Sequence, residues 1–195
     1  QWTWFVPHDV DGLVELMGGR DAFIGKLDSL FTADSKLEGE STSVDISGLI
    51  GQYAHGNEPS HHIAHLYNYV GQPWRTQEIV DEVLHTLYFN NPDGLSGNED
   101  CGQMSAWYIL NAMGFYQVCP GKPVYSIGRP LFNEATVHLK DGKSFKVIAH
   151  NNSRDNKYVR SIVLNGNKLE TPFFTHQDIV DGGTLELTMG SEPLK

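Results

Sequence analysis

The chain has 195 residues, of which 39% are hydrophobic, so it is long enough for one large domain or two small ones. It carries 14 Lys and Arg against 24 Asp and Glu, a formal charge of -10. No basic cluster is present, which argues against a nucleic-acid or anionic-membrane partner. No apolar run approaches the roughly 18 residues of a membrane-spanning helix. The chain opens without Met inside the aromatic run Gln1–Phe5, and we expect it to be a piece of a longer polypeptide.

Helical patterns separated by polar or glycine-rich loops occupy the first part of the chain. Asp9 is expected to cap the first helix and Gly18 to end it. Residues 32–46 show no clear period and predict a surface loop, whereas 47–53 fit no single element. The predicted helices are Val10–Met17, Arg20–Phe31, His61–Val70 with Ser60 as N-cap, Arg75–Tyr88 with Thr76 as cap, and Gly102–Ala112 ended by Gly114. This order is typical of antiparallel helical hairpins.

After Pro120 the pattern changes to short β-rich runs punctuated by Gly, Pro, Asn and Asp. The predicted strands are Val124–Ile127, Glu134–Leu139, Phe145–His150, Tyr158–Leu164 and Leu185–Met189, with a hairpin turn at Lys140–Lys143. We therefore expect an α+β protein with a helical part over 1–119 and a small antiparallel β module over 120–195. The module would form a sandwich or a sheet packed on the helices.

The stretch Asn90–Tyr108 gathers acidic and amide groups in a glycine-rich loop that leads into an apolar helix. Asp93, Asn98, Glu99 and Asp100 supply its side-chain oxygens. Asp100 is placed at or just before the helix start, where free N–H groups and the macrodipole favour an ionised carboxylate. The same pattern equally fits a simple N-cap on an acidic surface loop.

A second cluster lies in His55–His62, where a carboxylate, an amide and three imidazoles occur together. Asn57 and Glu58 are oxygen donors of the kind that calcium prefers. His61 and His65 have the i,i+4 spacing of a zinc pair, but His62 stands where the metalloprotease pattern needs Glu, so zinc is the weaker alternative. A third possibility is that these histidines only cap and pack.

Aromatic residues next to acids form the third cluster, with Trp2, Trp4 and Phe5 close to His8 and Asp9. Aromatic rings stack on the C–H faces of sugars and carboxylates bind hydroxyls, although the rings can equally be core. Helix 103–113 would separate Cys101 and Cys119 by about 16 Å, which disfavours a disulfide between them without excluding it, so we expect two free buried thiols.

Three motifs in order, WFVPHD (Trp4–Asp9), HGNEPSHH (His55–His62) and GNEDCGQMSAWYILNAMGFYQVCPG (Gly97–Gly121), cover the three clusters. In this order they resemble the C-terminal part of glycoside hydrolase family 92, the calcium-dependent, exo-acting α-mannosidases. The resemblance spans the whole chain. It implies the last helices of an (α/α)6-barrel catalytic domain followed by a β region, without the family's separate N-terminal β-sandwich. It also implies inverting hydrolysis of α-linked mannose, often α-1,2, from N-glycans or yeast mannan.

Residue roles follow from the same resemblance. Asp100 matches the family's general base. Some relatives carry an Asp two places before the base, where this chain has Asn98. If that second acid assists the base, Asn98 either weakens the assignment of Asp100 as the base or leaves the assisting role to Glu99. The general acid would lie just before Gln1. The implied site residues are Asn57, Glu58 and Asp100 for calcium, and Trp2, His8, Asp9, His55 and Glu99 for the mannose-containing glycan.

The resemblance also suggests where the protein is located and what it binds. The resemblance suggests a periplasmic, cell-surface or secreted bacterial protein whose partners are glycans and the remainder of the parent polypeptide. The alternative is a non-catalytic carbohydrate-binding or structural domain. If the chain is a fragment, Phe23, Leu27 and Phe31 are expected to be exposed, because they would pack on missing neighbours.

Overall fold

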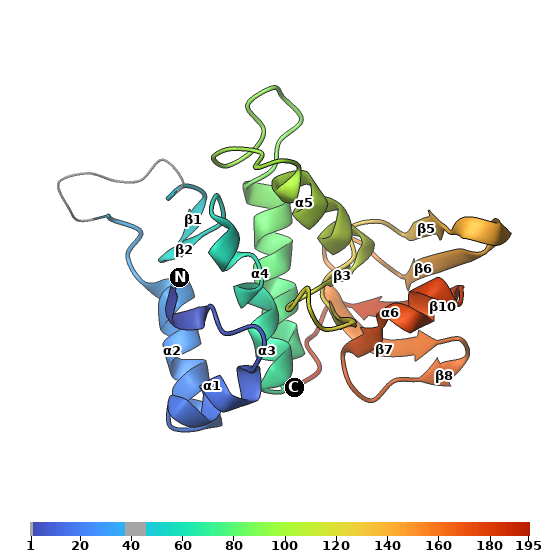
Figure 1. The fold of residues 1–195 in the computed structure, drawn as a ribbon, viewed down its shortest axis with the longest axis horizontal. Coiled ribbons are helices and arrows are strands. Elements are labelled where there is room, and N and C mark those ends of the chain that lie inside the picture. The colour runs from blue at the N-terminus through green and yellow to red at the C-terminus, as the bar shows by residue number, and fades with distance from the viewer. Residues whose placement is uncertain (1, 38–45) are drawn as a thin grey trace.

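The structure is a computed structural model that describes residues 2–37 and 46–195. Gln1 and residues 38–45, part of the predicted surface loop, lie outside the described residues. Helices occupy one side of the molecule and a sheet the other, with α4 between them (Figure 1). The α-helices are α1 (Val10–Leu16), α2 (Arg20–Thr32), α3 (Leu66–Tyr69), α4 (Pro73–Thr86), α5 (Gln103–Met113) and α6 (His176–Val180), and the short 3-10 turns are η1 (Trp2–Trp4), η2 (Glu58–Ser60), η3 (Ile63–His65) and η4 (Lys140–Gly142).

The first two helices confirm the sequence prediction. The Asp9 carboxylate caps α1 by accepting the Gly12 N–H at 3.0 Å. α2 turns one face inward through Phe23, Leu27 and Phe31, which are all buried. The expectation that these three side chains are exposed is wrong, because Trp4 lies edge-on to Phe23, and the rings of Tyr53 and Tyr67 pack on Phe31.

The segment before α4 departs from the predicted helix His61–Val70. It consists of the short hairpin β1 (Leu49–Ile50) and β2 (Tyr53–Ala54), followed by η2, η3 and the single-turn helix α3. Its side chains bond to distant groups, as when His62 bonds the Trp4 carbonyl at 2.8 Å, and the segment is buried on nearly all sides. These tertiary bonds outweigh the helical period that the sequence shows.

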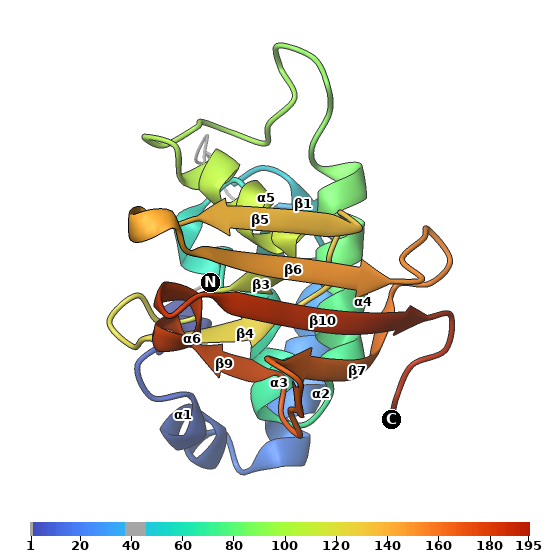
Figure 2. The same cartoon turned by 90° about the vertical axis from the view of Figure 1, so that its right-hand side faces the viewer.

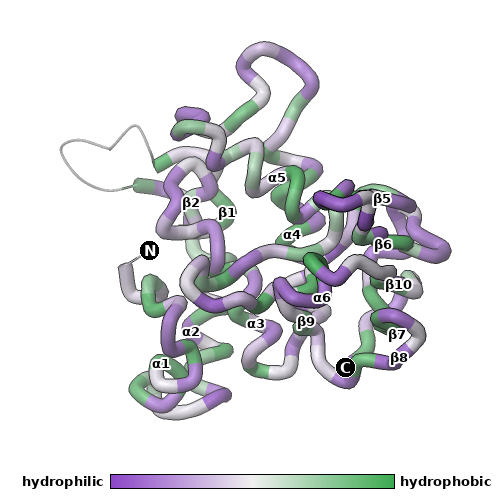
Figure 3. Tube along the Cα trace, turned by 45° about the vertical axis from the view of Figure 1, so that its right-hand side comes forward, coloured by the Kyte–Doolittle hydropathy of each residue, from purple (hydrophilic) through white to green (hydrophobic). Residues whose placement is uncertain are grey.

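The two long helices on either side of the polar loop are close to prediction. α4 begins at Pro73, which suits a first helical position because proline lacks the N–H that this position leaves unbonded. Thr76 is not a cap, since its hydroxyl donates to the Ala64 carbonyl at 2.9 Å. Gly114 caps the end of α5 with a φ of 103°, a backbone conformation that disfavours residues with side chains, and an added Cβ would lie only 3.0 Å from the Pro130 side chain. The loop between α4 and α5 projects from the body and is largely hydrophilic (Figure 3).

The β part contains a sheet in the order β5-β6-β10-β7-β8 and a smaller one in the order β3-β4-β9. Figure 2 shows the larger sheet face on, with the helices behind it. The strands are β3 (Phe115–Tyr116), β4 (Val124–Ile127), β5 (Glu134–His138), β6 (Ser144–His150), β7 (Tyr158–Leu164), β8 (Asn167–Lys168), β9 (Phe173–Thr175) and β10 (Gly183–Gly190). The predicted all-antiparallel pairing is wrong at the centre, where β6 and β10 run parallel because the chain crosses through β7–α6 before returning.

Two apolar cores lie on either side of α5, and Leu110 packs against both. The helical core surrounds Phe23, Tyr67 and Trp107, and the β core surrounds Phe145 and Leu187. β3 precedes the predicted division at residue 119 and pairs with β4 beyond it. The division itself stays a prediction. Among the described residues, no helix is long and apolar enough to cross a membrane.

Candidate active site

Four segments far apart in the sequence line one cavity of about 440 Å³. They are residues 5–7 after η1, 58–62 at η2, 100–103 at the start of α5, and 116–120 from the end of β3 onward. Glu58 and Asp100, which the sequence places in separate motifs, line this same cavity. The cavity therefore brings together all three sequence clusters.

An unusual backbone turn places Asp100. Asp100, Cys101 and Gly102 have φ angles of 53°, 56° and 91°, three consecutive residues in the left-handed region that disfavours side chains. Gly102, not Asp100, is the N-cap of α5, so the interpretation of Asp100 as a simple cap is wrong. The Gln103 N–H bonds the Asp100 carbonyl at 3.2 Å. The Asp100 carbonyl thus accepts a hydrogen bond at the start of α5, while Asp100 itself lines the cavity.

The residues next to Asp100 stabilise this turn. The two carboxylate oxygens of Glu99 accept from Ser105, one from its N–H at 3.0 Å and the other from its hydroxyl at 3.1 Å. Asn98 is exposed, and Cys101 is exposed rather than buried as predicted. Cys101 and Cys119 are both free, in agreement with the sequence. Glu99 therefore fastens the loop to α5, and its contact with substrate stays a prediction.

The histidines of the second cluster use their ring nitrogens inside the protein. His55 bonds the hydroxyls of Tyr53 at 2.8 Å and Tyr88 at 2.7 Å. His61 bonds the His55 carbonyl and the Gln103 side chain, and His65 bonds Ser126 and Asn111. Since neither His61 nor His65 offers a nitrogen to a metal, the zinc alternative is wrong for this pair.

Burial also sets the charge of these rings. It lowers the pKa of His61 and of His65 to about 4, although the bonds from the His55 carbonyl and from Asn111 act in the opposite direction. Burial lowers the pKa of His62 as well. At neutral pH the wall of the cavity is therefore built of uncharged imidazoles next to carboxylates.

The oxygen donors around the cavity are of the kind that calcium binds. Glu58 and Asp100 offer carboxylate oxygens in the cavity, and Asn57 precedes Glu58 as the cap of η2. In the part of the chain that the structure describes, no three His, Cys, Asp or Glu side chains cluster as a complete metal site. Calcium takes 6–8 oxygen ligands and accepts carbonyls, waters and hydroxyls among them. The oxygen donors fit part of such a shell.

The remaining predicted residues lie around the cavity or away from it. Trp2 is 73% exposed and lies edge-on to Phe5, a lining residue, at 5.8 Å. His8 and Asp9 are exposed and do not line the cavity, and Asp9 is engaged in capping α1. Buried His55 supports the wall from behind. The substrate contacts assigned to these four residues stay predictions.

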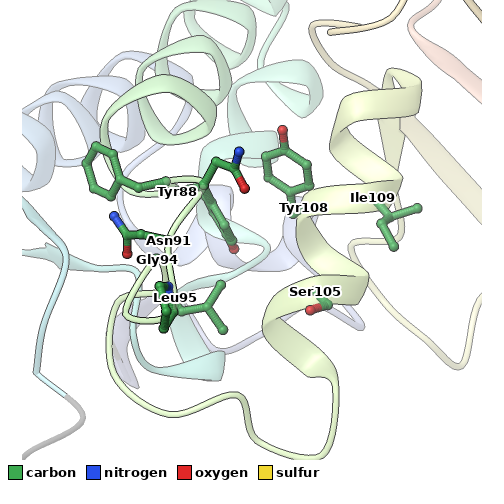
Figure 4. A pocket seen from close by; sticks show the side chains of 10 residues that line it. Tyr88, Asn91, Gly94, Leu95, Ser105, Tyr108 and Ile109 are labelled. Atoms are coloured by element: carbon green, nitrogen blue, oxygen red, sulfur yellow. The ribbon is translucent and has the colours of Figure 1, made fainter.

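A second, larger cavity of about 530 Å³ lies between the polar loop and α5. Figure 4 shows Tyr88, Leu95, Ser105, Tyr108 and Ile109 around it. Neither Glu58 nor Asp100 lines this cavity. Hydrolytic chemistry needs carboxylates, and of these two cavities the smaller is the one with carboxylates among its described lining residues, so the smaller cavity is the candidate active site.

Comparison with known proteins decides the family. Residues 1–191 match the glycosyl hydrolase family 92 catalytic domain. The chain belongs to this family. The α-mannosidase BT3965 of Bacteroides thetaiotaomicron is 43% identical over 98% of this chain and 25% of its own, with a TM-score of 0.89 for one structure and 0.92 for its complex with mannoimidazole.

Two further proteins are similar to nearly the whole of this family 92 chain. The inverting mannosidase BT2199 of Bacteroides thetaiotaomicron is 45% identical over 98% of this chain and 27% of its own, with a TM-score of 0.84. An uncharacterized secreted glycosidase of Arthroderma benhamiae is 32% identical over 97% of this chain and 23% of its own. The chain thus spans about a quarter of the length of the relatives it matches.

Two residues that line the candidate cavity, Gln103 and Tyr116, were not identified from the sequence. Gln103 lies three residues after Asp100 within the third motif, so the start of a helix there is a signal that it shares the Asp100 wall. Tyr116 lies in β3, beyond the end of α5, and lines the cavity together with residues far away in the sequence. No local sequence pattern indicates that position.

Proposed function

We propose that this chain is the part of a calcium-dependent, inverting exo-α-mannosidase that carries the general base, Asp100. The observation that supports the proposal most is the convergence of Asp100 and Glu58 on one cavity in a chain of family 92. Two relatives in the comparison are named as mannosidases, and one of them as inverting. We extend the preference to α-1,2-linked mannose in N-glycans or mannan on the family resemblance.

The proposed chemistry needs two groups. In an inverting hydrolysis one carboxylate removes a proton from water as the water oxygen bonds the anomeric carbon, while an acid protonates the departing glycosidic oxygen. Asp100 serves as the base in this proposal. In this proposal the general acid comes from another segment of the parent polypeptide. The BT3965 mannosidase is about four times as long as this chain, so such a parent would contain further segments.

Calcium completes the proposed site. Asn57, Glu58 and Asp100 would hold it together with waters and sugar hydroxyls, and the bound ion would polarise those hydroxyls. The neutral histidines suit this arrangement because they add no positive charge to repel the ion. The helices of this chain would form the last part of an (α/α)6 barrel, and the parent would be secreted or exposed at the cell surface, as the description of the Arthroderma relative suggests.

A substitution in the full-length parent tests the role of Asp100. Asp100→Asn should lower kcat for an α-1,2-mannobioside by about 10²–10⁴-fold, because the amide keeps the shape but cannot take the proton. Asp93→Asn is the matched control, since Asp93 lies in the same loop, is exposed and does not line the cavity. Wild-type turnover by Asp100→Asn would remove Asp100 from the role, and binding of mannosides without hydrolysis by the parent would favour the non-catalytic alternative.

Chelation tests the metal separately. Treatment of the parent with a calcium chelator should abolish hydrolysis, and added calcium should restore it, because the available donors are oxygens. Zinc should not restore activity, since the ring nitrogens of His61 and His65 are already bonded. Restoration by zinc but not by calcium would overturn this part of the proposal.

A further inference from the structure

Gln103 and Tyr116 lie next to each other on the wall of the Asp100 cavity. The Gln103 side-chain nitrogen is 3.2 Å from the Tyr116 hydroxyl oxygen, and both residues line the cavity. Gln103 is half-buried at the start of α5, while the Tyr116 ring is buried in β3. Two polar side chains are thus fixed beside the proposed base.

A chain of hydrogen bonds fixes the polarity of this pair. The carbonyl of His55 only accepts, so the proton of His61 sits on Nε2, 2.9 Å away. His61 is 2% exposed, a burial that disfavours a second proton on its ring. Its Nδ1 is then an acceptor, and the Gln103 amide nitrogen donates to it at 3.0 Å.

The same bonds determine which atoms of Gln103 and Tyr116 can donate to a ligand or accept from it. One hydrogen of the Gln103 amide goes to His61 and the other to the Tyr116 oxygen, so the amide nitrogen has no further donor. In the part of the chain that the structure describes, the carbonyl oxygen of Gln103 makes no bond of its own, so it can accept from a ligand. The Tyr116 hydroxyl already accepts from Gln103, and burial raises its pKa to about 12, so it keeps its own proton to donate.

We propose that Gln103 and Tyr116 form a hydroxyl-recognition pair, in which one hydroxyl of the bound sugar donates to Gln103 Oε1 and accepts from the Tyr116 O–H. Only a group that both donates and accepts satisfies the two partners. An ether, a fluorine or a hydrogen at that position leaves at least one of them unpaired, which costs binding in the cavity. The inference rests on the proposed mannoside function and names specificity residues for it.

The test uses the full-length parent and a set of α-mannosides, each lacking one hydroxyl of the nonreducing sugar. For one of these analogues, kcat/KM of the wild type should fall by about 10–100-fold. Tyr116→Phe should lower kcat/KM for the intact substrate to a similar extent but should add little for that analogue. Gln103→Met should show the same loss of discrimination for the same hydroxyl.

Controls separate recognition from structural damage. Tyr158→Phe is the matched control, because it also removes one phenol hydrogen bond, to Glu78, but its ring lies away from the cavity. It should leave the ranking of the analogues unchanged, and circular dichroism should confirm that each variant is folded. If Tyr116→Phe lowers kcat/KM equally for every analogue, or not at all, or if the two variants couple to different hydroxyls, the pair is not a recognition pair. Failure of the wild-type parent to hydrolyse any mannoside would instead overturn the proposed function, and this inference with it.

Discussion

The helical part and the β part of the chain are stabilised in different ways. The β core is almost wholly apolar, with Phe145, Leu185 and Leu187 at its centre. The fully or nearly fully buried polar side chains belong mostly to the helical part, including His55, His61, His62, His65 and Asn68. A region that buries so many polar groups must satisfy them through specific bonds, which fixes side-chain positions more narrowly than apolar packing does. The cavity lies in that region.

Even the two buried polar residues of the β part serve the helical part. The Ser126 hydroxyl bonds His65 at 3.0 Å and Asn68 at 2.6 Å. Arg129 is 2% exposed and pairs with Asp81 of α4 at 2.8 Å. The end of β4 and the residues just after it therefore support the helical part through bonds to His65, Asn68 and Asp81.

The largest expected effect comes from removing the buried ion pair between Asp81 of the helical part and Arg129 of the β part. Asp81→Ala leaves the Arg129 guanidinium buried without its carboxylate, which should cost about 3–5 kcal/mol of unfolding free energy. Glu186→Ala is the control, because Glu186 pairs with His150 on the exposed face of the sheet and should cost less than about 1 kcal/mol. Urea unfolding followed by circular dichroism measures the unfolding free energy of both variants. Equal losses would show that the Asp81–Arg129 pair stabilises the protein no more than an exposed pair does.

Acid should affect the helical part in particular. Burial lowers the pKa of His65 to about 4, below the value near 6.5 of an unfolded chain, so the unfolded state binds its proton first as the pH falls. The stability from neutral His65 is complete above about pH 6.5 and is lost towards pH 4, by about 3 kcal/mol in all. Between about pH 4 and 6.5, His65→Gln should reduce the slope of the unfolding free energy against pH by the amount that one bound proton contributes. The same substitution at the exposed His138 should not reduce this slope. Identical slopes for wild type and His65→Gln would contradict the assignment.

A cap in the β part should give the smallest effect. Thr175 and Asp178 form a capping box at the start of α6, where the Asp178 carboxylate accepts the Thr175 N–H at 2.7 Å. Thr175→Ala should cost about 1 kcal/mol and speed amide exchange in α6 alone. Thr171→Ala, at an exposed threonine in the loop before β9, is the control. Faster exchange in the helices around the cavity would show that the effect of this cap is not confined to α6.

The sequence predicted the parts that depend on local pattern. The alternating burial along Ser144–His150 and the apolar period of α2 and α4 mark elements that each pack one face on a core, and such local patterns can be recognised in the sequence. The parallel pairing of β6 and β10 was missed, since it depends on the crossover between them and not on either strand. The 3-10 path of 58–65 was missed because its histidines bond to residues as distant as Trp4 and Ser126.

The candidate site was predictable only in part. Oxygen-rich motifs marked Glu58 and Asp100, but the left-handed turn at Asp100 has two residues with side chains where glycine is usual, so no turn signal announced it. The sequence could not show that the ring nitrogens of His55 bond Tyr53 and Tyr88, and its predicted contact with substrate stays a prediction. Which polar groups face a ligand depends on which are already bonded, and that information lies in the tertiary structure.

The position of a bound sugar mimic tests the central claim most directly. A crystal structure of the full-length parent with mannoimidazole, the ligand in one BT3965 structure, would show which cavity receives the sugar. We expect the ligand in the cavity lined by Glu58, Asp100 and Gln103. A ligand found instead between Tyr88 and Tyr108, in the larger cavity beside α5, would contradict the assignment of the active site.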